Sequence, residues 1–158
     1  MLHVIVDPQN DFCHEDGVFS TSAKPVLDAI VAQKNKEGVT SVATRDWHPA
    51  NHISFVSTWP VHCVQNTWGA ELHDAVKGVM EFDKGMCEMT EEYSGINAVN
   101  RQTRKSLRQF VEDFSPSEIV VSGFVMEFCV KATFDDLKSA FPTTKISLLD
   151  GGVHCLQQ

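Results

Sequence analysis

The amino-acid sequence predicts an α/β protein: a three-layer, doubly wound and mainly parallel sheet of about five strands with helices on both faces. Three observations lead to this fold class. Short runs of aliphatic and β-branched residues recur along the chain, and most of them do not alternate with polar residues, as expected for parallel strands covered on both faces. Amphipathic helical patterns lie between several of these runs. The resulting alternation of strand and helix is typical of right-handed crossover units.

The expected strands lie, in order, at residues 2–7, 41–44, 79–82, 119–122 and 146–150. The expected helices place apolar side chains on one face. They cover residues 26–31, 107–114 and 130–141, and Pro142 ends the last of them. With 158 residues, of which 42% are hydrophobic, the chain is long enough for one well-packed core, so we expect a single domain over residues 1–158.

The net charge argues against two classes of partner. The chain has 13 Lys and Arg residues against 21 Asp and Glu residues, and the net charge of −8 opposes attraction to nucleic acid or to an anionic membrane surface. No apolar run approaches the roughly 20 residues of a membrane span, and residues 1–7 lack the basic region of a signal peptide. The five cysteines form no CxxC pair, which favours free thiols. Together these features predict a cytoplasmic protein.

Four residues that can carry chemistry fall at the expected carboxyl ends of strands. Asp7 closes the first strand, Asp46 follows the second, Lys84 follows the third, and Cys129 lies just past the fourth. In an open α/β sheet these ends meet at one crevice, where ligands bind. We therefore expect the four residues to be neighbours in space, although Asp7 and Lys84 are 77 positions apart in the sequence.

The loops after the second strand are rich in metal-binding residue types. Asp46 and His48 lie close together, and His62 follows in the segment 59–63. Divalent ions such as Zn²⁺ bind nitrogen and oxygen donors, and a catalytic site uses about three protein ligands. The cluster predicts a divalent-metal site made by Asp46, His48 and His62, although each histidine taken alone could be an ordinary loop residue. His52 could be a fourth ligand, a residue that supports a ligand, or a loop-packing residue.

Cys129 lies at the expected start of the third helix, in the segment 123–130. A helix N-terminus stabilises an anion, so we expect the pKa of the Cys129 thiol to be lowered there. The turn from Val125 to Cys129 also offers backbone N–H groups that could hold an oxyanion. A buried structural cysteine is an equally good interpretation of the position alone.

Lys84 and Asp7 are the expected partners of the thiol. An ammonium group in the crevice would lower the pKa of a neighbouring thiol further. A carboxylate at the end of a buried strand needs a partner or a task, and the role of a general base fits. Lys84 could instead be an ordinary surface lysine. Asp7 could instead be a turn residue before Pro8, but Asp11 fits that turn role better.

These residues occur in motifs that resemble those of the nicotinamidases, in the isochorismatase-like cysteine hydrolase superfamily, along nearly the whole chain. The motifs are Asp7-Pro8-Gln9-Asn10-Asp11-Phe12, Asp46-Trp47-His48, Trp59-Pro60-Val61-His62-Cys63, Lys84-Gly85 and Met126-Glu127-Phe128-Cys129-Val130-Lys131. The resemblance implies that Cys129 is the nucleophile and that Asp7 and Lys84 complete a catalytic triad.

The resemblance also implies a substrate and a pocket. Nicotinamide would be hydrolysed to nicotinate and ammonia through a cysteine thioester, a reaction of NAD salvage. Phe12, Trp59 and Tyr93 would wall a pocket for the flat pyridine ring. The N–H groups of Val125 and Cys129 would bind the oxyanion.

The metal motif is what separates nicotinamidases from isochorismatases, which resemble them in fold and in triad order. By this resemblance Asp46, His48 and His62 would hold one divalent metal that orients the pyridine. Zn²⁺ is the first expectation, and Fe and Mn are the alternatives, because all three suit carboxylate and imidazole ligands.

The sequence departs from the family pattern at two places. Residues 125–127, Val-Met-Glu, stand where many bacterial members have Ala-Thr-Asp, in a loop that often contains a cis peptide. The domain is also short at its C-terminus, where relatives usually continue with another helix and strand. Two alternatives therefore stay open: a related hydrolase acting on another small amide or a vinyl ether, and a metal- or ligand-binding homologue without turnover. An exposed fifth-strand edge would make a homo-oligomer plausible.

Overall fold

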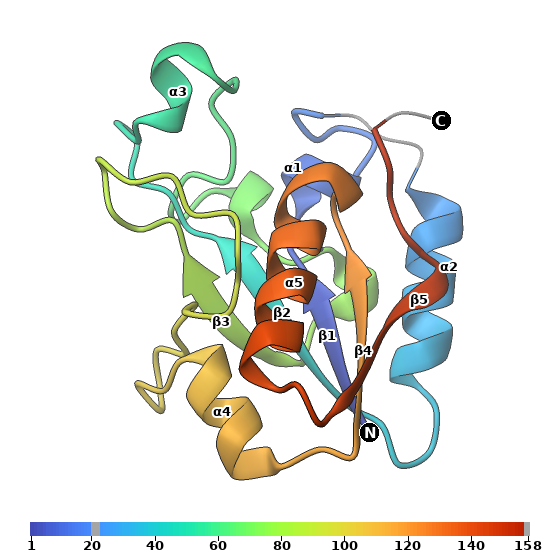
Figure 1. The fold of residues 1–158 in the computed structure, drawn as a ribbon. Helices are drawn as coiled ribbons and strands as arrows, with labels where there is room; N and C mark the ends of the chain where they lie inside the picture. Colours follow the sequence, from blue (N-terminus) through green and yellow to red (C-terminus); the bar gives the residue numbers. More distant parts are fainter. Residues whose placement is uncertain (20–22, 157–158) are drawn as a thin grey trace.

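The central strand of the sheet is β1 (Leu2–Val6), whose residues are all buried. In the computed structural model, which describes residues 1–19 and 23–156, β1 pairs in parallel with β2 (Thr40–Asp46) and with β4 (Glu118–Gly123). The outer strands are β3 (Met80–Lys84), beside β2, and β5 (Lys145–Val153), beside β4. Within these described residues the sheet has five parallel strands in the order β3-β2-β1-β4-β5, which confirms the predicted fold class (Figure 1).

One face of the sheet is covered mainly by α2 (Lys24–Lys34). Successive side chains of a strand point to opposite faces, and on this face Ile5 of β1 shares a buried apolar cluster with Leu27 and Ile30 of α2. Short helical turns complete the layer. They are α1 (Asn10–Cys13), η1 (Trp68–Ala70) and η2 (Asp74–Val76).

The other face is covered by α4 (Leu107–Phe114) and α5 (Lys131–Ala140). Val4 of β1 shares the larger buried cluster with Val111 of α4 and Leu137 of α5. Within the described part of the chain, no helix combines the length and the apolar character that crossing a bilayer requires. Two short elements lie at the carboxyl end of the sheet, α3 (Ser54–Ser57) and the π-helical turn η3 (Met126–Val130).

Strands β2 to β5 all run further at their carboxyl ends than the sequence patterns indicated, and β4 does so by one residue. β2 ends at Asp46 and β3 at Lys84, so both residues are the last residues of strands rather than loop residues. The two strands pair there with Asp46 opposite Lys84. β5 is also longer than expected and reaches Val153. The sheet itself therefore fixes the positions of Asp46 and Lys84.

The chain leaves β3 on one side of β1 and returns at β4 on the other, so the topological switch point lies between β1 and β4. Gly123 ends β4 with a φ of 122°, and a Cβ atom at this position would lie 2.0 Å from the carbonyl oxygen of Val6. Glycine is needed here because the backbone that leads to η3 passes this close to the end of β1.

His3 is a buried imidazole in β1 and makes stability depend on pH. Its Nε2 lies 2.8 Å from Ser122 Oγ, and its Nδ1 lies 3.3 Å from Ser41 Oγ. Burial lowers the pKa of His3 from 6.5 to about 4, and the positive charge of Lys36 adds to this effect. The unfolded chain therefore binds a proton near pH 6.5, whereas the folded chain binds it only near pH 4. The stability that neutral His3 contributes is therefore complete above pH 6.5, and it is lost as the pH falls from 6.5 towards about 4.

We expect the free energy of unfolding to fall by about 2 kcal/mol between about pH 7.5 and about pH 5 because of His3. The His3→Gln variant, which has a neutral polar side chain, should lose this part of the pH dependence. Urea unfolding of both proteins at the two pH values measures the difference. The same pH dependence in both proteins would contradict the role of His3.

Candidate active site

Lys84 lies at the centre of the candidate active site and contacts the three residues that the sequence predicted to converge with it. Its Nζ lies 3.0 Å from Asp7 Oδ2 and 3.5 Å from Cys129 Sγ, and it donates a hydrogen bond to Asp46 Oδ1. It also donates a hydrogen bond to the backbone carbonyl of Glu92 at 3.2 Å. The ends of β1, β2 and β3 and the turn η3 bring these groups together.

The charges of this cluster hold Lys84 as an ammonium and Asp46 as a carboxylate. Burial alone would lower the pKa of Lys84, but Asp46 and Asp7 outweigh burial and raise it well above its ordinary value. Burial alone would raise the pKa of Asp46, but Lys84 and His48 hold it well below its usual range. Both groups therefore keep their charges at neutral pH.

Asp7 has one carboxylate oxygen in a position to take a proton. Its Oδ1 accepts a hydrogen bond from Thr44 Oγ1 at 2.7 Å, whereas Oδ2 has no hydrogen bond of good geometry from the described residues and lies 3.0 Å from Lys84 Nζ. Burial raises the pKa of Asp7; Lys84 lowers it and Asp46 raises it, and the net shift is upwards. A carboxylate oxygen of Asp7 lies within 4.8 Å of Cys129 Sγ. The thiol therefore faces a carboxylate of raised basicity.

Cys129 lies in η3, immediately before α5, as the sequence indicated. Burial raises the pKa of its thiol; Lys84 lowers it, but Asp7 and Asp46 raise it, and the net value lies well above the ordinary one. The expectation of a lowered pKa is therefore wrong. One lysine does not create a resting thiolate at a buried position that two carboxylates share with it.

Asp46, His48 and His62 form a compact cluster of buried metal-ligand side chains. Asp46 Oδ2 lies 3.5 Å from His48 Nε2 and 3.9 Å from His62 Nε2. The Nδ1 atoms point the other way, to the backbone carbonyl of Gly85 at 2.8 Å from His48 and of Pro60 at 2.7 Å from His62. A neutral histidine that donates Nδ1–H to a carbonyl presents an unprotonated Nε2, as metal-binding histidines do. These three side chains therefore fit a divalent metal.

His52 lies beside this cluster but outside it. Its ring stacks on that of His48 with the centroids 4.0 Å apart. Its Nδ1 lies 2.6 Å from Ser54 Oγ and its Nε2 lies 3.0 Å from the backbone carbonyl of Thr90. Because both ring nitrogens are engaged, the geometry favours a supporting role for His52 over that of a fourth ligand.

Two residues of the segment after β1 hold in place the segments that carry Asp46 and His62. The side-chain amide of Gln9 accepts a hydrogen bond from Asp46 N–H at 2.7 Å and donates one to the Asp46 carbonyl at 2.6 Å. Asp11 accepts a hydrogen bond from the N–H of Cys63, the residue after His62, at 2.7 Å. The sequence prediction assigned no role to Gln9, whose only signal was its place in the motif that begins at Asp7.

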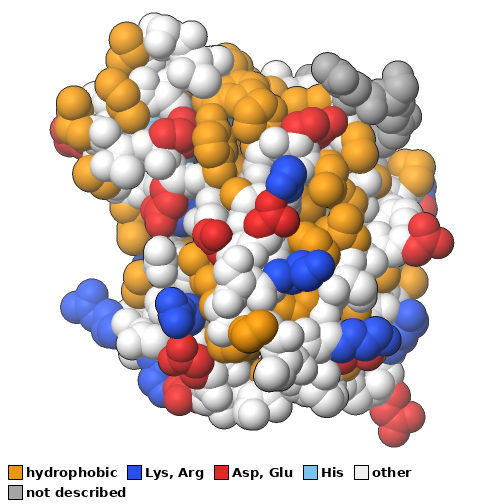
Figure 2. Space-filling view, in the orientation of Figure 1, with side chains coloured by type: hydrophobic (Ala, Val, Ile, Leu, Met, Phe, Trp, Pro, Cys, Tyr) orange, Lys and Arg blue, Asp and Glu red, His pale blue; other side chains and the backbone are white. Residues whose placement is uncertain are grey.

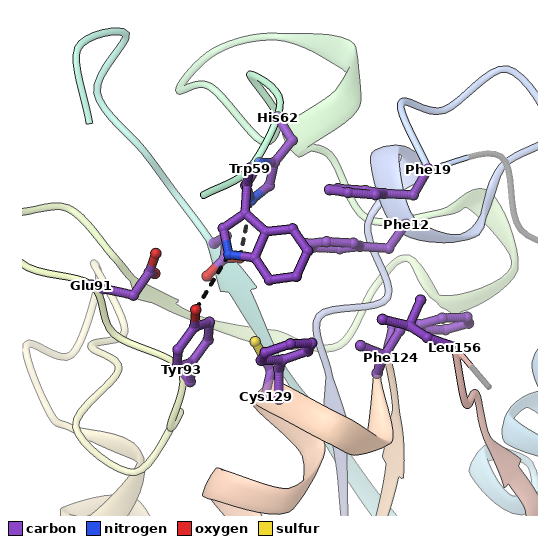
Figure 3. A pocket seen from close by; sticks show the side chains of 12 residues that line it. Phe12, Phe19, Trp59, His62, Glu91, Tyr93, Phe124, Cys129 and Leu156 are labelled. Atoms are coloured by element: carbon purple, nitrogen blue, oxygen red, sulfur yellow. Dashed lines mark hydrogen bonds and ion pairs between the residues drawn. The ribbon is translucent and has the colours of Figure 1, made fainter. Parts of the chain in front are cut away.

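An aromatic pocket opens beside Cys129 (Figure 3). Phe12 and Phe19 stack with their centroids 5.3 Å apart, and Trp59 Nε1 donates a hydrogen bond to Tyr93 Oη at 3.3 Å. Phe12, Trp59 and Tyr93, the three residues expected around a ring, all line it. Hydrophobic side chains gather on the molecular surface above the N-terminal end of α5, where this pocket lies (Figure 2). Other lining residues are Asp46, His62, Glu91, Phe124, Val125, Phe128 and Leu156.

The sequence prediction missed Phe19, Phe128 and Leu156 as pocket residues. Phe128 precedes Cys129, and its ring meets that of Trp59 edge to face with the centroids 4.9 Å apart. Adjacency to Cys129, the predicted nucleophile, was a usable signal for Phe128. Phe19 and Leu156 lie in segments without a helix or strand pattern, and only the tertiary fold brings them to the pocket.

The two N–H groups expected to bind an oxyanion belong to one tight turn. The backbone N–H groups of Phe128 and Val130 both donate to the carbonyl of Val125 at 3.2 Å, which closes the turn that contains Cys129. The peptide bond between Phe124 and Val125 is cis. The N–H groups of Val125 and Cys129 are thus carried on the same short segment as the thiol.

Comparison with known proteins gives a consistent set of relatives. Residues 1–139 match the family model of the isochorismatase domain. The nicotinamidase of Escherichia coli is 32% identical over 159 residues, which cover 84% of this chain and 74% of the relative.

Solved structures give similar results. A protein of L. infantum in complex with nicotinate has a TM-score of 0.85 and 29% identity, with 99% of this chain and 82% of that chain covered. A pyrazinamidase of Pyrococcus horikoshii in complex with zinc has a TM-score of 0.81 and 29% identity, with 99% of this chain and 87% of that chain covered.

Proposed function

This chain belongs to the isochorismatase family and is a hydrolase that acts on an amide bond, and from that premise we propose that it converts nicotinamide to nicotinate and ammonia, a reaction of NAD salvage. One observation carries the proposal. Cys129, with Asp7 and Lys84 behind it, lines the same aromatic pocket as Asp46 and His62 of the metal-ligand cluster. The similarity to a nicotinamidase and to a nicotinate complex supports this choice of substrate.

The pocket suits a flat aromatic amide. Rings such as those of Trp59 and Tyr93 can pack against the faces and edges of a pyridine. Asp46, His48 and His62 would hold the divalent metal that the resemblance to nicotinamidases implies, with Zn²⁺ favoured over Fe and Mn. A bound metal would supply a positive site for the lone pair of the pyridine nitrogen.

The first half of the proposed reaction forms a thioester. Asp7 takes the proton of the Cys129 thiol, Sγ forms a bond to the carboxamide carbon, and the carbonyl electron pair moves to oxygen. The N–H groups of Val125 and Cys129 bind this oxyanion. Asp7 then gives its proton to the amide nitrogen, the C–N bond breaks, and ammonia leaves. Lys84 stays protonated and offsets the negative charge that Asp7 and the sulfur carry in turn.

The second half returns the enzyme to its starting state. Asp7 takes a proton from a water molecule while the water oxygen attacks the thioester carbon. The oxyanion again rests on the same backbone N–H groups. The C–S bond then breaks, and Asp7 returns the proton to the sulfur of Cys129. The product acid loses its remaining proton to water and leaves as nicotinate. Both halves need a carboxylate that is more basic than usual, and burial raises the pKa of Asp7 in that direction.

Removal of the metal should stop turnover and leave the fold intact. After chelation and dialysis we expect ammonia release to fall by at least about 100-fold, because the ring nitrogen would lose the site that orients it. Turnover should return when Zn²⁺, Fe²⁺ or Mn²⁺ is added back, and elemental analysis of the untreated protein identifies the resident metal. Full turnover by metal-free protein would contradict the role of the metal.

Ammonia release from a panel of small amides tests the substrate itself. We expect kcat/KM for nicotinamide to exceed that for aliphatic amides by at least about 100-fold, because only the aromatic amide fills the pocket. A higher kcat/KM on another amide, or on a vinyl ether, would identify a related hydrolase instead. Binding of nicotinamide without ammonia release by metal-replete protein would identify a homologue that does not turn over.

A further inference from the structure

The segment that follows β5 is joined to the turn that carries Cys129. The backbone N–H of His154 donates to the Gly123 carbonyl at 3.0 Å, and the His154 carbonyl accepts from Met126 N–H at 2.8 Å. The ring of His154 stacks on that of Phe124 with the centroids 5.8 Å apart. The segment after β5 therefore follows the backbone around η3 as an added strand would.

Glu127 extends this contact by two residues. Both of its carboxylate oxygens accept a hydrogen bond from the backbone N–H of Leu156, at 3.0 Å and 3.1 Å. Glu127 lies in η3, two residues before Cys129, so the carboxylate that holds Leu156 is attached to the nucleophile turn itself. Leu156 lines the same pocket as Cys129, and Figure 3 shows it beside Phe124.

We propose that Glu127 is a positioning residue that holds Leu156 against the pocket, and that Leu156 thereby limits the size of the ring substituents that the enzyme accepts. The inference rests on the proposed function for its substrate series, which is pyridine carboxamides with and without a methyl group on the ring. The Glu127 carboxylate acts through the backbone of Leu156.

Burial alone gives Leu156 a weak hold on the pocket wall. Its exposed fraction is 47%, so it gains only part of the free energy that a fully buried leucine gains from the removal of apolar surface from water. Its backbone N–H is held within hydrogen-bond distance of both carboxylate oxygens of Glu127, at 3.0 Å and 3.1 Å. The contact between the Glu127 carboxylate and the backbone of Leu156 therefore determines where the Leu156 side chain lies.

The length of the Glu127 side chain decides whether the contact can form. Aspartate is one methylene shorter and would end about 1.5 Å short of the Leu156 N–H. Glutamine has the length of glutamate and keeps one oxygen acceptor. If the contact matters, Glu127→Gln keeps the function and Glu127→Asp loses it; if only the negative charge matters, the order is reversed.

Steady-state hydrolysis of nicotinamide and of singly ring-methylated nicotinamides by the metal-replete chain tests the proposal. Glu127→Gln should behave as the unaltered protein does. Glu127→Asp should raise KM for nicotinamide about threefold and change kcat by less than about twofold, because the wall moves and the reacting groups do not. For at least one methylated amide, kcat/KM relative to nicotinamide should rise about threefold.

Leu156→Ala should shift selectivity in the same direction, and the addition of Glu127→Asp to Leu156→Ala should have no further effect. Additive effects of the two substitutions would overturn the inference, because Glu127 would then act by another route. Equal KM values and equal selectivity in Glu127→Gln and Glu127→Asp would overturn it as well.

Amide hydrogen exchange gives a second readout that does not depend on turnover. The N–H of Leu156 should exchange about threefold faster in Glu127→Asp than in Glu127→Gln. If the unaltered protein released no ammonia from nicotinamide, the proposed function would fail while this measurement still tested the contact. Equal exchange in the two variants would show that Glu127 does not hold Leu156.

Discussion

The Cys129→Ala variant should release ammonia from nicotinamide at least about 10⁴-fold more slowly than the unaltered protein. Alanine removes the sulfur that would form the thioester, and the neighbouring groups cannot replace it. Lys84 is an ammonium whose pKa is raised by Asp46 and Asp7, so it lacks the free electron pair of a nucleophile. The loss should appear in an ammonia assay of metal-replete protein, with the free energy of unfolding lowered by no more than about 1 kcal/mol.

Two controls make this result specific to the nucleophile. Cys87→Ala removes an exposed thiol and should leave turnover unchanged. Mass spectrometry of acid-quenched protein should detect the nicotinoyl thioester in the unaltered chain and in Cys87→Ala, and no adduct in Cys129→Ala. Ammonia release by Cys129→Ala at the normal rate would exclude Cys129 as the nucleophile.

The largest effect on stability should come from Lys84→Met, which we expect to lower the free energy of unfolding of the metal-free protein by about 3–5 kcal/mol. The side chains of Lys84 and Asp7 are 0% exposed, and that of Asp46 is 7% exposed. Methionine fills a similar volume, but it leaves two buried carboxylates without their cation. Urea unfolding measures the loss, and turnover should disappear with it.

Two further variants show whether the unpaired charge is the cause. Lys84→Met combined with Asp7→Asn removes one of the two buried carboxylate charges, and it should regain part of the lost stability but no turnover. Lys105→Met breaks an ion pair with Asp113 in which both side chains are more than half exposed, and it should cost less than about 1 kcal/mol. Similar losses for Lys84→Met and Lys105→Met would refute the role of the buried charges.

The fold class and the convergence of the candidate residues were predictable because strand ends are visible in the sequence. Asp7, Asp46 and Lys84 each follow or end a run of aliphatic residues, and parallel strands bring such ends to one edge of the sheet. Neither expectation required knowledge of side-chain contacts. The expected second and third strands ended too early because the last residues of β2 and β3 are charged, which hides their strand character.

The electrostatics of the site and the completion of the pocket were not predictable in this way. The pKa of Cys129 depends on the balance between burial, one ammonium and two carboxylates, and only the distances among them decide its direction. Gln9 fixes the backbone of Asp46 through hydrogen bonds between residues that are 37 positions apart in the sequence. No local sequence pattern predicts such a contact. Leu156 reaches the pocket because of the path of the chain after β5, which amphipathic patterns do not encode.

The pairing of β1 with β4 joins residues more than a hundred positions apart, beginning with Leu2 beside Ile119. Contacts of this sequence separation must overcome a large loop-closure entropy and are slow to form during folding. The groups around Lys84 come from both sides of that pairing, since Asp7 follows β1 and Cys129 follows β4. A newly made chain can therefore acquire its helices and the β1–β2 pair early, and it becomes a catalyst only when its most distant strands have met.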